Sequence, residues 1–311
     1  MRLSADMSLA YYGKPLIVTY SGGKDSDVML YLAATTLKPH EFEVFNSHTT
    51  VDAPETVYHI RDTFKKLNKY GIKTFIDYHI VNGKPVTMWN LIPKKSIPPT
   101  RIFRYCCTVL KEAGTPNRIA SLGVREAESN KRAGRQIFGI RGKTYKDANF
   151  YSLSHAEEVH RESQEINDPV WDCKLIETMK KHGEAVVNPI YHWSDSDIWN
   201  FIQQNHIETN PLYQCGYTRV GCIGCPLAAH NFRVKEFEDY PRFKKCYVLA
   251  FEKMLKVNKE KGLKYKREFK TGEEVFEWWM EEHKYNIKRT DEFVRDRVII
   301  CRKYFSMKTK D

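Results

Sequence analysis

A glycine-rich segment between two apolar stretches constrains the fold of this chain more than any other feature. Residues 15–20 (PLIVTY) are typical of a buried strand, and residues 27–34 (DVMLYLAA) have the apolar spacing of a helix. Between them lies SGGKDS, at residues 21–26. At such a turn, glycines let backbone N–H groups approach an oxyanion, and the helix dipole favours its negative charge. The segment therefore predicts a phosphate-binding loop, although it does not match the Walker A pattern, GxxxxGK followed by Ser or Thr.

The chain continues with alternating strand and helix patterns. Residues 41–47 and 73–81 each predict a strand, and residues 53–70 predict an amphipathic helix with Pro54 in its first turn, where proline is tolerated. Residues 93–100 predict a proline-rich loop. Strands that alternate with helices are typical of a parallel sheet. We therefore expect an α/β fold with a twisted parallel sheet and helices on both faces.

The composition describes a basic, folded chain of 311 residues, with 50 Lys and Arg against 39 Asp and Glu and a net charge of +11. A hydrophobic content of 41% excludes a disordered chain. No apolar run approaches the ~18 residues that a transmembrane helix needs, and residues 1–14 lack the apolar core of a signal peptide. We therefore expect a cytoplasmic protein with no membrane partner, whose charge permits a polyanionic ligand.

The surplus positive charge is concentrated towards the C-terminal end. Residues 231–311 carry 22 Lys and Arg against 15 Asp and Glu, a net charge of +7, in long helical patterns. We expect a nucleotide-binding α/β domain with the cysteine cluster over residues 1–230, followed by a smaller, basic and mainly helical region. Residues 256–270 hold seven Lys and Arg interleaved with Tyr265 and Phe269, which suits either a nucleic-acid backbone or a solvated helix face.

Four of the eight cysteines stand in a pattern that predicts a metal site. Cys106 and Cys107 are adjacent, and the CxxC formed by Cys222 and Cys225 begins 115 residues after Cys107. A CxxC lets two thiolates reach one metal, and a second pair from elsewhere completes four sulfur ligands. Zinc and an iron–sulfur cluster are both open at this point, as is a redox dithiol in the CxxC alone.

The remaining cysteines give one alternative set of ligands. Cys215 and Cys246 could join the CxxC in a second quartet, with the spacing C-x6-C-x2-C-x20-C. Cys173 and Cys301 are expected to be free cysteines in or near a core.

The phosphate-binding loop resembles that of the PP-loop ATP pyrophosphatases, the adenine nucleotide alpha-hydrolase family with a Rossmann-like fold. Enzymes of this family cleave ATP between the α- and β-phosphates and bind the released pyrophosphate in the loop. The resemblance implies that ATP is the nucleotide, that the loop holds its β- and γ-phosphates, and that Asp25 contributes to a Mg²⁺ site. The corresponding residues are Ser21, Gly22, Gly23, Lys24, Asp25 and Ser26.

Further segments resemble the branch of this family that contains the phosphoadenosine-phosphosulfate (PAPS) and adenosine-phosphosulfate (APS) reductases. The segment NSHTTVDAPET resembles the second nucleotide segment of the branch and implies that Asp52 and Glu55 contact the nucleotide. The segment GVREAESNKR resembles its arginine segment and implies that Arg125 and Arg132 bind an anionic substrate. Arginine suits this role because its planar fork pairs two phosphate or sulfate oxygens at once.

The cysteines resemble the same branch, because adjacent cysteines followed by a distant CxxC form the 4Fe-4S pattern of APS reductases. The resemblance implies a 4Fe-4S cluster held by Cys106, Cys107, Cys222 and Cys225. Adjacent cysteines are an awkward way to bind a single ion, because neighbouring side chains diverge, so few other metal sites use them.

Two departures from the reductases change the expected activity. Their catalytic cysteine lies in a C-terminal Glu-Cys-Gly-x-His segment, whereas Cys301 is followed by RKYFSMKTKD. The reductases also degrade the phosphate loop, which is intact here with Lys24. An intact pyrophosphate site without the reducing nucleophile predicts that the protein activates a substrate with ATP.

The predicted function is therefore an iron–sulfur ATP pyrophosphatase that converts ATP to AMP and pyrophosphate and serves sulfur transfer to nucleic acid, with DNA phosphorothioation as the leading reaction. Lys24, Asp25, Arg125 and Arg132 are the expected catalytic residues, and DNA or tRNA and a cysteine desulfurase are the expected partners. Two alternatives stay open: an APS or PAPS reductase with an unrecognised nucleophile, and a non-catalytic nucleotide-binding subunit.

Overall fold

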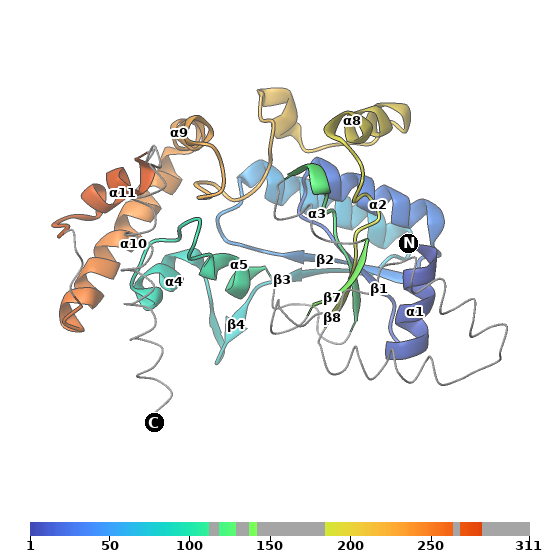
Figure 1. The fold of residues 1–311 in the computed structure, drawn as a ribbon, viewed down its shortest axis with the longest axis horizontal. Helices are drawn as coiled ribbons and strands as arrows, with labels where there is room; N and C mark the ends of the chain where they lie inside the picture. Colours follow the sequence, from blue (N-terminus) through green and yellow to red (C-terminus); the bar gives the residue numbers. More distant parts are fainter. Residues whose placement is uncertain (112–117, 129–136, 142–183, 264–267, 282–311) are drawn as a thin grey trace.

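The computed structural model describes residues 1–111, 118–128, 137–141, 184–263 and 268–281 (Figure 1). Arg132, Cys173, Tyr265 and Cys301, which the sequence singles out, lie outside the described residues. Figure 1 shows a sheet with its helices at one end of the molecule and a group of helices, including α4, α10 and α11, at the other.

A six-stranded sheet organises the first of these parts. Its order is β3-β2-β1-β6-β8-β7, and neighbouring strands are parallel except for β7, which runs antiparallel to β8 at one edge. The predicted parallel sheet is confirmed, with an antiparallel edge strand in addition. The strands are β1 (Leu16–Thr19), β2 (Phe42–Ser47), β3 (Thr74–Asp77), β6 (Ile119–Ser121), β7 (Phe138–Arg141) and β8 (Glu184–Val187).

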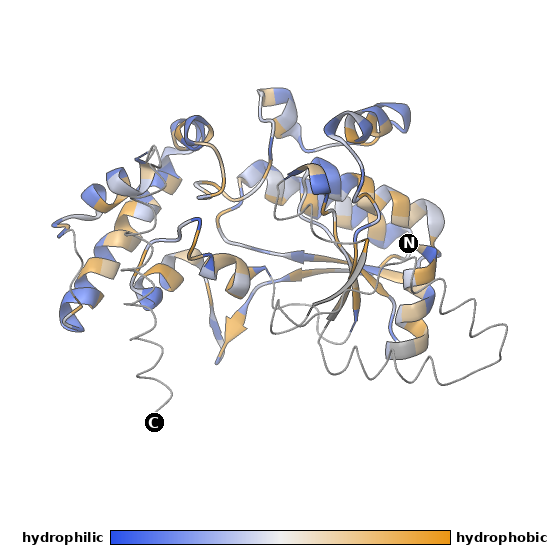
Figure 2. Cartoon of the chain, in the orientation of Figure 1, coloured by the Kyte–Doolittle hydropathy of each residue, from blue (hydrophilic) through white to orange (hydrophobic). Residues whose placement is uncertain are grey.

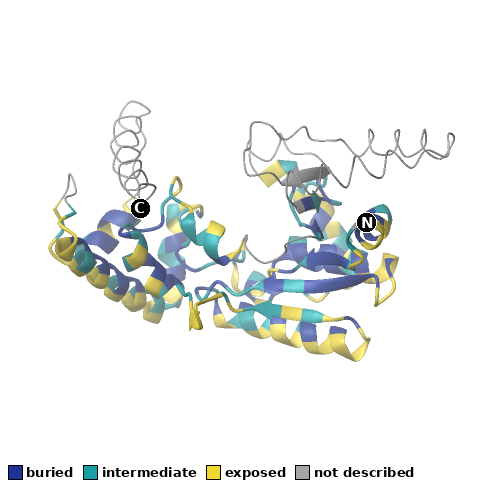
Figure 3. Cartoon of the chain, turned by 90° about the horizontal axis from the view of Figure 1, so that it is seen from below, coloured by how far each residue is buried: buried dark blue, intermediate teal, exposed yellow. Residues whose placement is uncertain are grey.

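Four helices pack around this sheet. They are α1 (Arg2–Tyr12), α2 (Lys24–Thr36), α3 (Pro54–Lys69) and α8 (Asp195–Gln204). The first three share one core with the strands, in which Leu16, Val18 and Phe64 are buried. α8 packs on α2 through a separate cluster that contains Met29 and Ile198. Figure 3 shows the resulting contrast between the buried strands and the exposed outer sides of the helices.

A second core lies among the other helices that the structure describes. These are α4 (Met88–Lys95), α5 (Tyr105–Leu110), α9 (His230–Asp239), α10 (Pro241–Glu260) and α11 (Gly272–Met280). Phe251, Trp278 and Trp279 are buried there together with Val51 and Leu212 from earlier segments, and Figure 2 shows the apolar bands along α10. The core thus takes residues from both sides of residue 230, and the predicted domain boundary stays a prediction.

The structure differs from the sequence interpretation in two local places. The strand predicted over residues 73–81 is divided, because β3 ends at Asp77 and the chain forms a separate hairpin of β4 (Ile80–Val81) and β5 (Lys84–Pro85). Asn82 and Gly83 both have positive φ, at 52° and 72°, as a two-residue type I′ turn requires. The loop predicted over residues 93–100 begins later than expected, because α4 includes Pro93 and ends at Lys95.

Two short 3₁₀ turns complete the elements, η1 (Glu126–Glu128) and η2 (Pro211–Cys215). Within the described residues, every helix is too short or too polar to cross a membrane.

Candidate functional site

The glycine-rich loop joins the carboxyl end of β1 to the first turn of α2. Gly22 has a φ of +73°, and a Cβ at this position would lie 2.9 Å from Cγ1 of Ile60 in α3. Only glycine fits this combination of backbone conformation and close packing. Gly23 caps α2, with its N–H donated to Oγ of Ser26 (3.1 Å) and its carbonyl accepting from the same hydroxyl (2.7 Å). The loop is thereby held in one conformation at a helix N-terminus.

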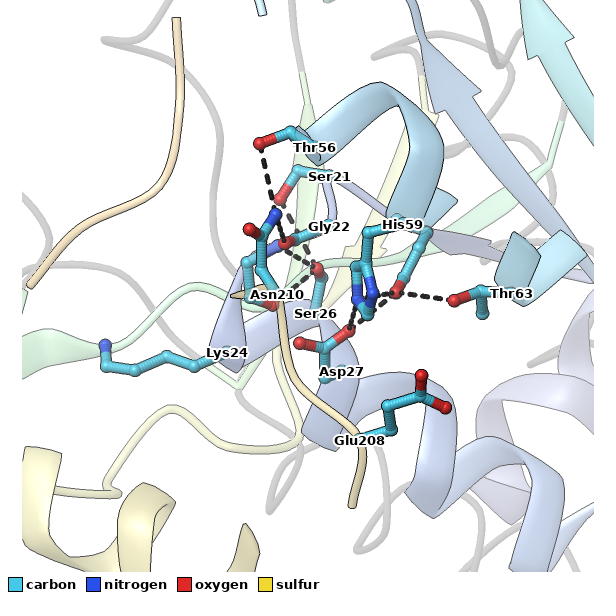
Figure 4. A network of polar contacts seen from close by, with 12 residues as sticks. Ser21, Gly22, Lys24, Ser26, Asp27, Thr56, His59, Thr63, Glu208 and Asn210 are labelled. Carbon is cyan, nitrogen blue, oxygen red and sulfur yellow. Dashed lines mark hydrogen bonds and ion pairs between the residues drawn. The ribbon is translucent and has the colours of Figure 1, made fainter. Parts of the chain in front are cut away.

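Side chains from the far end of the sequence support the loop (Figure 4). Nδ2 of Asn210, which is fully buried, donates to the carbonyl of Gly22 (3.0 Å) and to Oγ1 of Thr56 (3.1 Å). The hydroxyl of Tyr213 accepts from the N–H of Lys24 (2.9 Å). The sequence analysis assigns neither Asn210 nor Tyr213 to the site, because nothing local indicates which distant loop they reach.

A network of four charges surrounds the start of α2. Nζ of Lys24 lies 3.2 Å from Asp25 and 3.1 Å from Asp195, and Arg125 donates through Nε to Asp25 and through Nη2 to Asp195, both at 2.7 Å. Arg125 is 2% exposed and Lys24 is 8% exposed. Burial opposes ionisation of Asp195, but the Lys24 ammonium and the Arg125 guanidinium outweigh it and lower its pKa. Two cations and two carboxylates therefore balance one another.

A cavity of about 410 Å³ opens beside this network. Its lining combines the Lys24 ammonium with aromatic rings, of which Trp199 and Tyr213 meet edge to face at 5.2 Å. Lysine and helix N–H groups attract an anion, and aromatic faces suit a planar base. The lining residues are Lys24, Asp195, Trp199, Tyr213, Gly216, Tyr217 and Thr218.

A second polar network lies behind the loop and ties α2 to α3 (Figure 4). The hydroxyl of Tyr20 donates to Oδ1 of Asp27 (2.6 Å), and Nε2 of His59 lies 3.2 Å from the same oxygen. Burial raises the pKa of Asp27, although hydrogen bonds from His59 and Tyr20 counteract this effect. The network points away from the cavity that Lys24 lines, so it supports the loop from within.

Asp52 and Glu55, predicted to contact a nucleotide, have protein partners in the structure. Oδ2 of Asp52 accepts from the N–H and the hydroxyl of Thr49, at 3.2 and 2.7 Å, and the backbone of Asp52 forms an isolated bridge with Cys222. Glu55 accepts from the hydroxyl of Tyr240 (2.8 Å). Their segment therefore links the loop to the cysteine region.

The four predicted cysteines come from two elements of the second core. Cys106 and Cys107 lie in α5, and Cys222 and Cys225 lie in the turn that precedes α9. All four are half-buried and free of disulfides. The hydrogen bond with Cys107 and burial raise the pKa of Cys106, and the charges of Cys222 and Cys225 act in the same direction. A hydrogen bond from Cys106, together with Arg104 at 3.4 Å, lowers the pKa of Cys107 to about 5. The structure thus brings the four thiols into one region.

Cations accompany these thiols. The charge of Cys222 and then that of Asp52 raise the pKa of Lys111, and the charges of Cys107 and Cys225 act in the same direction. Arg101 donates to the carbonyls of Pro226 and Ala228, just after the CxxC. Cysteine thiolates are the ligands that hold iron–sulfur clusters, and neighbouring charges and hydrogen bonds tune such a group.

The side chains of the predicted metal site do not converge on one position for a metal ion. Across the described ranges, no group of three or more His, Cys, Asp or Glu side chains is placed to hold one metal ion. Cys215 and Cys246, the alternative ligands, are exposed. The 4Fe-4S cluster therefore stays a prediction that rests on the chemistry of the four thiols and their neighbours.

Comparisons with known proteins agree with the sequence resemblance. The family model of the phosphoadenosine phosphosulfate reductase domain matches residues 15–228. Over 238 residues, the chain is 25% identical to an uncharacterized protein of Methanocaldococcus jannaschii, covering 74% of this chain and 40% of that protein. It is 26% identical to sulfate adenylyltransferase subunit 2 of Nocardia farcinica over 208 residues, or 63% of this chain and 58% of that subunit. The chain thus spans less than two thirds of the length of these relatives.

A shorter match joins the chain to a named reductase. Over 117 residues it is 30% identical to adenosine 5'-phosphosulfate reductase of Allochromatium vinosum, covering 36% of this chain and 37% of that enzyme. Among solved structures, PAPS reductase from Candida auris aligns with a TM-score of 0.40 and 14% identity over 70% of this chain and 88% of that chain. The U34-tRNA thiolase of Methanococcus maripaludis, solved with its 4Fe-4S cluster, aligns with a TM-score of 0.36 and 12% identity over 86% and 82%.

Proposed function

Because the chain belongs to the phosphoadenosine phosphosulfate reductase domain family, which matches residues 15–228, we propose that it is a cytoplasmic ATP pyrophosphatase of this family that activates a substrate for sulfur transfer. The observation that carries the proposal is the intact loop. Its glycine conformation and its capped helix N-terminus fix the loop, and Lys24, the first residue of that helix, lines the adjoining cavity. These are the parts that hold a leaving pyrophosphate.

In the proposed reaction, an oxygen of the acceptor attacks the α-phosphorus of ATP. The bond between that phosphorus and the oxygen bridging to the β-phosphate breaks, and pyrophosphate leaves into the loop. The Lys24 ammonium and the positive end of the α2 dipole offset the charge that develops on the leaving group. Bound Mg²⁺ would offset further phosphate charge, and the Asp25 carboxylate is its candidate ligand.

In the second half of the proposed reaction, sulfide-level sulfur bonds to the atom that carries the activated oxygen, and that oxygen leaves with AMP. Persulfide sulfur from a desulfurase reaches this level when a second thiol releases it and forms a disulfide with the carrier cysteine. Two chain segments connect the phosphate loop to the cysteines that would hold a 4Fe-4S cluster. Val220, two residues before Cys222, has its carbonyl 3.9 Å from a Cβ built on Gly23. Asp52 is bridged to Cys222, and Thr56, four residues later, is bonded to Asn210 of the loop support. A cluster held by the four cysteines would be linked to the loop by these two segments.

We propose nucleic acid as the acceptor, with DNA phosphorothioation as the leading case and a cysteine desulfurase as sulfur source. Support comes from the charge of the second part, where Lys245, Lys253, Lys256 and Lys259 are exposed along α10. Such a basic face attracts a phosphate backbone, and its binding should weaken steeply with salt.

A second candidate, an APS or PAPS reductase, is favoured by the family name and by the match to a named APS reductase. The match to a sulfate adenylyltransferase subunit favours ATP use instead. A non-catalytic subunit would bind nucleotide without turnover.

One anaerobic experiment separates these candidates. The purified protein, loaded with iron and sulfide, is offered ATP, APS or PAPS in turn, with DNA or tRNA as acceptor, while pyrophosphate and sulfite are measured. We expect pyrophosphate from ATP that depends on Lys24, and no sulfite. Sulfite from APS or PAPS without pyrophosphate from ATP would contradict the proposal, and nucleotide binding without either product would indicate the non-catalytic subunit.

A further inference from the structure

Arg233 occupies an unusual position in the first turns of α9, eight residues after Cys225. It is 7% exposed, and its guanidinium lies flat over the ring of Trp279 at 4.3 Å from the ring centre. Nη1 donates to the carbonyl of Trp279 (3.1 Å). The side chain is therefore fixed in the second core, although nothing in its local sequence predicts burial.

The rest of this guanidinium has no partner within the described part of the chain. Nε and Nη2 are buried and make no hydrogen bond. No described carboxylate lies within ion-pair distance of Arg233; Glu236, one turn later, accepts the N–H of Gly224 (2.7 Å). A buried charge without a counter-charge costs several kcal/mol, and each unmade hydrogen bond adds to this cost. Such a cost indicates that an anion completes the site.

Its neighbours place Arg233 beside the cysteines. Gly224, inside the CxxC, packs so closely that an added Cβ would lie 3.0 Å from the Trp279 ring that Arg233 covers. The ring of Tyr247 lies 4.8 Å from that of Trp279, and its hydroxyl donates to the carbonyl of Ile223 within the CxxC (2.9 Å).

We propose that the free N–H groups of Arg233 donate hydrogen bonds to sulfur of the iron–sulfur group held by the cysteines, and that its charge balances that group. Four thiolates make a ligated cluster an anion, and hydrogen bonds to its sulfurs are among the factors that set its reduction potential. This assignment rests on the cluster named in the proposed function, but it concerns a residue that no cysteine pattern identifies. Arg233 is a positioning and tuning residue and does not touch the nucleotide.

The test compares the iron-loaded wild type with Arg233→Met, Arg233→Lys and the matched control Arg242→Met, whose arginine is exposed at the start of α10. Iron and sulfide are counted, and the cluster is titrated with reductant and followed by electron paramagnetic resonance. A buried positive charge favours the reduced, more negative cluster. We expect Arg233→Met to lower the ratio of reduced to oxidised cluster at least tenfold at a fixed potential, or about 59 mV for one electron.

Arg233→Lys keeps the charge and loses the planar fork, so we expect a smaller change in the same direction, and Arg242→Met should match the wild type. Loaded Arg233 variants with wild-type potentials would overturn the inference and leave the proposed function intact. A wild type that binds zinc or no iron after reconstitution would overturn both. If Arg233→Met does not fold, as judged by its circular dichroism melt, Arg233→Lys decides the question in the same way.

Discussion

The two ends of the molecule treat buried positive charge in opposite ways. At the phosphate loop, Lys24 and Arg125 are matched by Asp25 and Asp195 at 2.7–3.2 Å. Near the cysteines, Arg233 has two buried nitrogens without a hydrogen bond and no described ion pair. The two cations at the loop are already paired with carboxylates before a ligand binds, so a phosphate must displace these carboxylates. The two buried N–H groups of Arg233, by contrast, gain hydrogen-bond partners only when a ligand enters.

This comparison predicts that the cysteine region depends on its ligand more strongly than the loop does. We expect Cys222→Ser to abolish iron binding and lower the melting temperature, because a group bound only by the folded state stabilises that state. Iron per chain and thermal melts measure this effect. Cys246→Ser, at an exposed cysteine on α10, is the control. Loss of iron in Cys246→Ser instead would favour the alternative quartet with Cys215.

Removal of the loop cation should abolish most activity with little effect on stability. We expect Lys24→Met to lower the rate of pyrophosphate release from ATP by about 10²–10³-fold, the usual effect of losing one charge-stabilising donor. Steady-state kinetics and urea unfolding measure the two quantities. Lys14→Met, at an exposed lysine, should leave both unchanged. An unchanged rate in Lys24→Met would mean that the loop does not hold the leaving group.

The rigidity of the loop can be tested with two glycines of nearly equal φ. Gly22 has a φ of +73° and Gly83 has a φ of +72°, but only Gly22 faces Ile60, while open space surrounds Gly83. We expect Gly83→Ala to cost about 1 kcal/mol of unfolding free energy for its backbone alone. Gly22→Ala should cost roughly 2–4 kcal/mol, because the clash adds to the backbone strain. Equal losses of unfolding free energy in the two variants would show that Ile60 and α3 move aside to accommodate the added Cβ.

The smallest expected effect is a gain in affinity for pyrophosphate. Because Asp195 neutralises both Lys24 and Arg125, Asp195→Asn should free these cations for phosphate. We expect pyrophosphate to bind three- to tenfold more tightly, a gain of about 1 kcal/mol, measured by calorimetry. Asp62→Asn, which removes an exposed carboxylate paired with Lys65, is the control. Weaker binding would show instead that Asp195 itself contacts the ligand or its metal.

Sequence patterns predicted the features that depend on local spacing. The apolar run before residue 21, the glycines and the helix that follows are consecutive, so the strand, loop and helix could be placed correctly. α1 was not predicted, since it begins without a side-chain cap at Met1 and without an acidic residue in its first turn. The Asn82-Gly83 pair is a turn signal that accounts for the division of the strand predicted over residues 73–81.

The contacts that complete the site could not be predicted in the same way. Asn210 reaches Gly22 across 188 residues, and Arg125 reaches Asp25 across 100. Nothing local to these residues indicates which distant group satisfies them, because the partner is set by how the sheet brings its strand ends together. Arg233 is the clearest case, since a surface position in a charged segment is the ordinary expectation for arginine.

The makeup of the second core also has a consequence for biosynthesis. Cys106 and Cys107 emerge from the ribosome well before the CxxC, and the core around all four thiols includes Trp278 and Trp279. A core of this kind cannot close until the distant segments have been synthesised. The thiols of Cys106 and Cys107 therefore stay outside a folded core, where oxidants can reach them, until translation has passed Trp279. A metal group that needs all four must be delivered after that point, which makes its insertion a late maturation step.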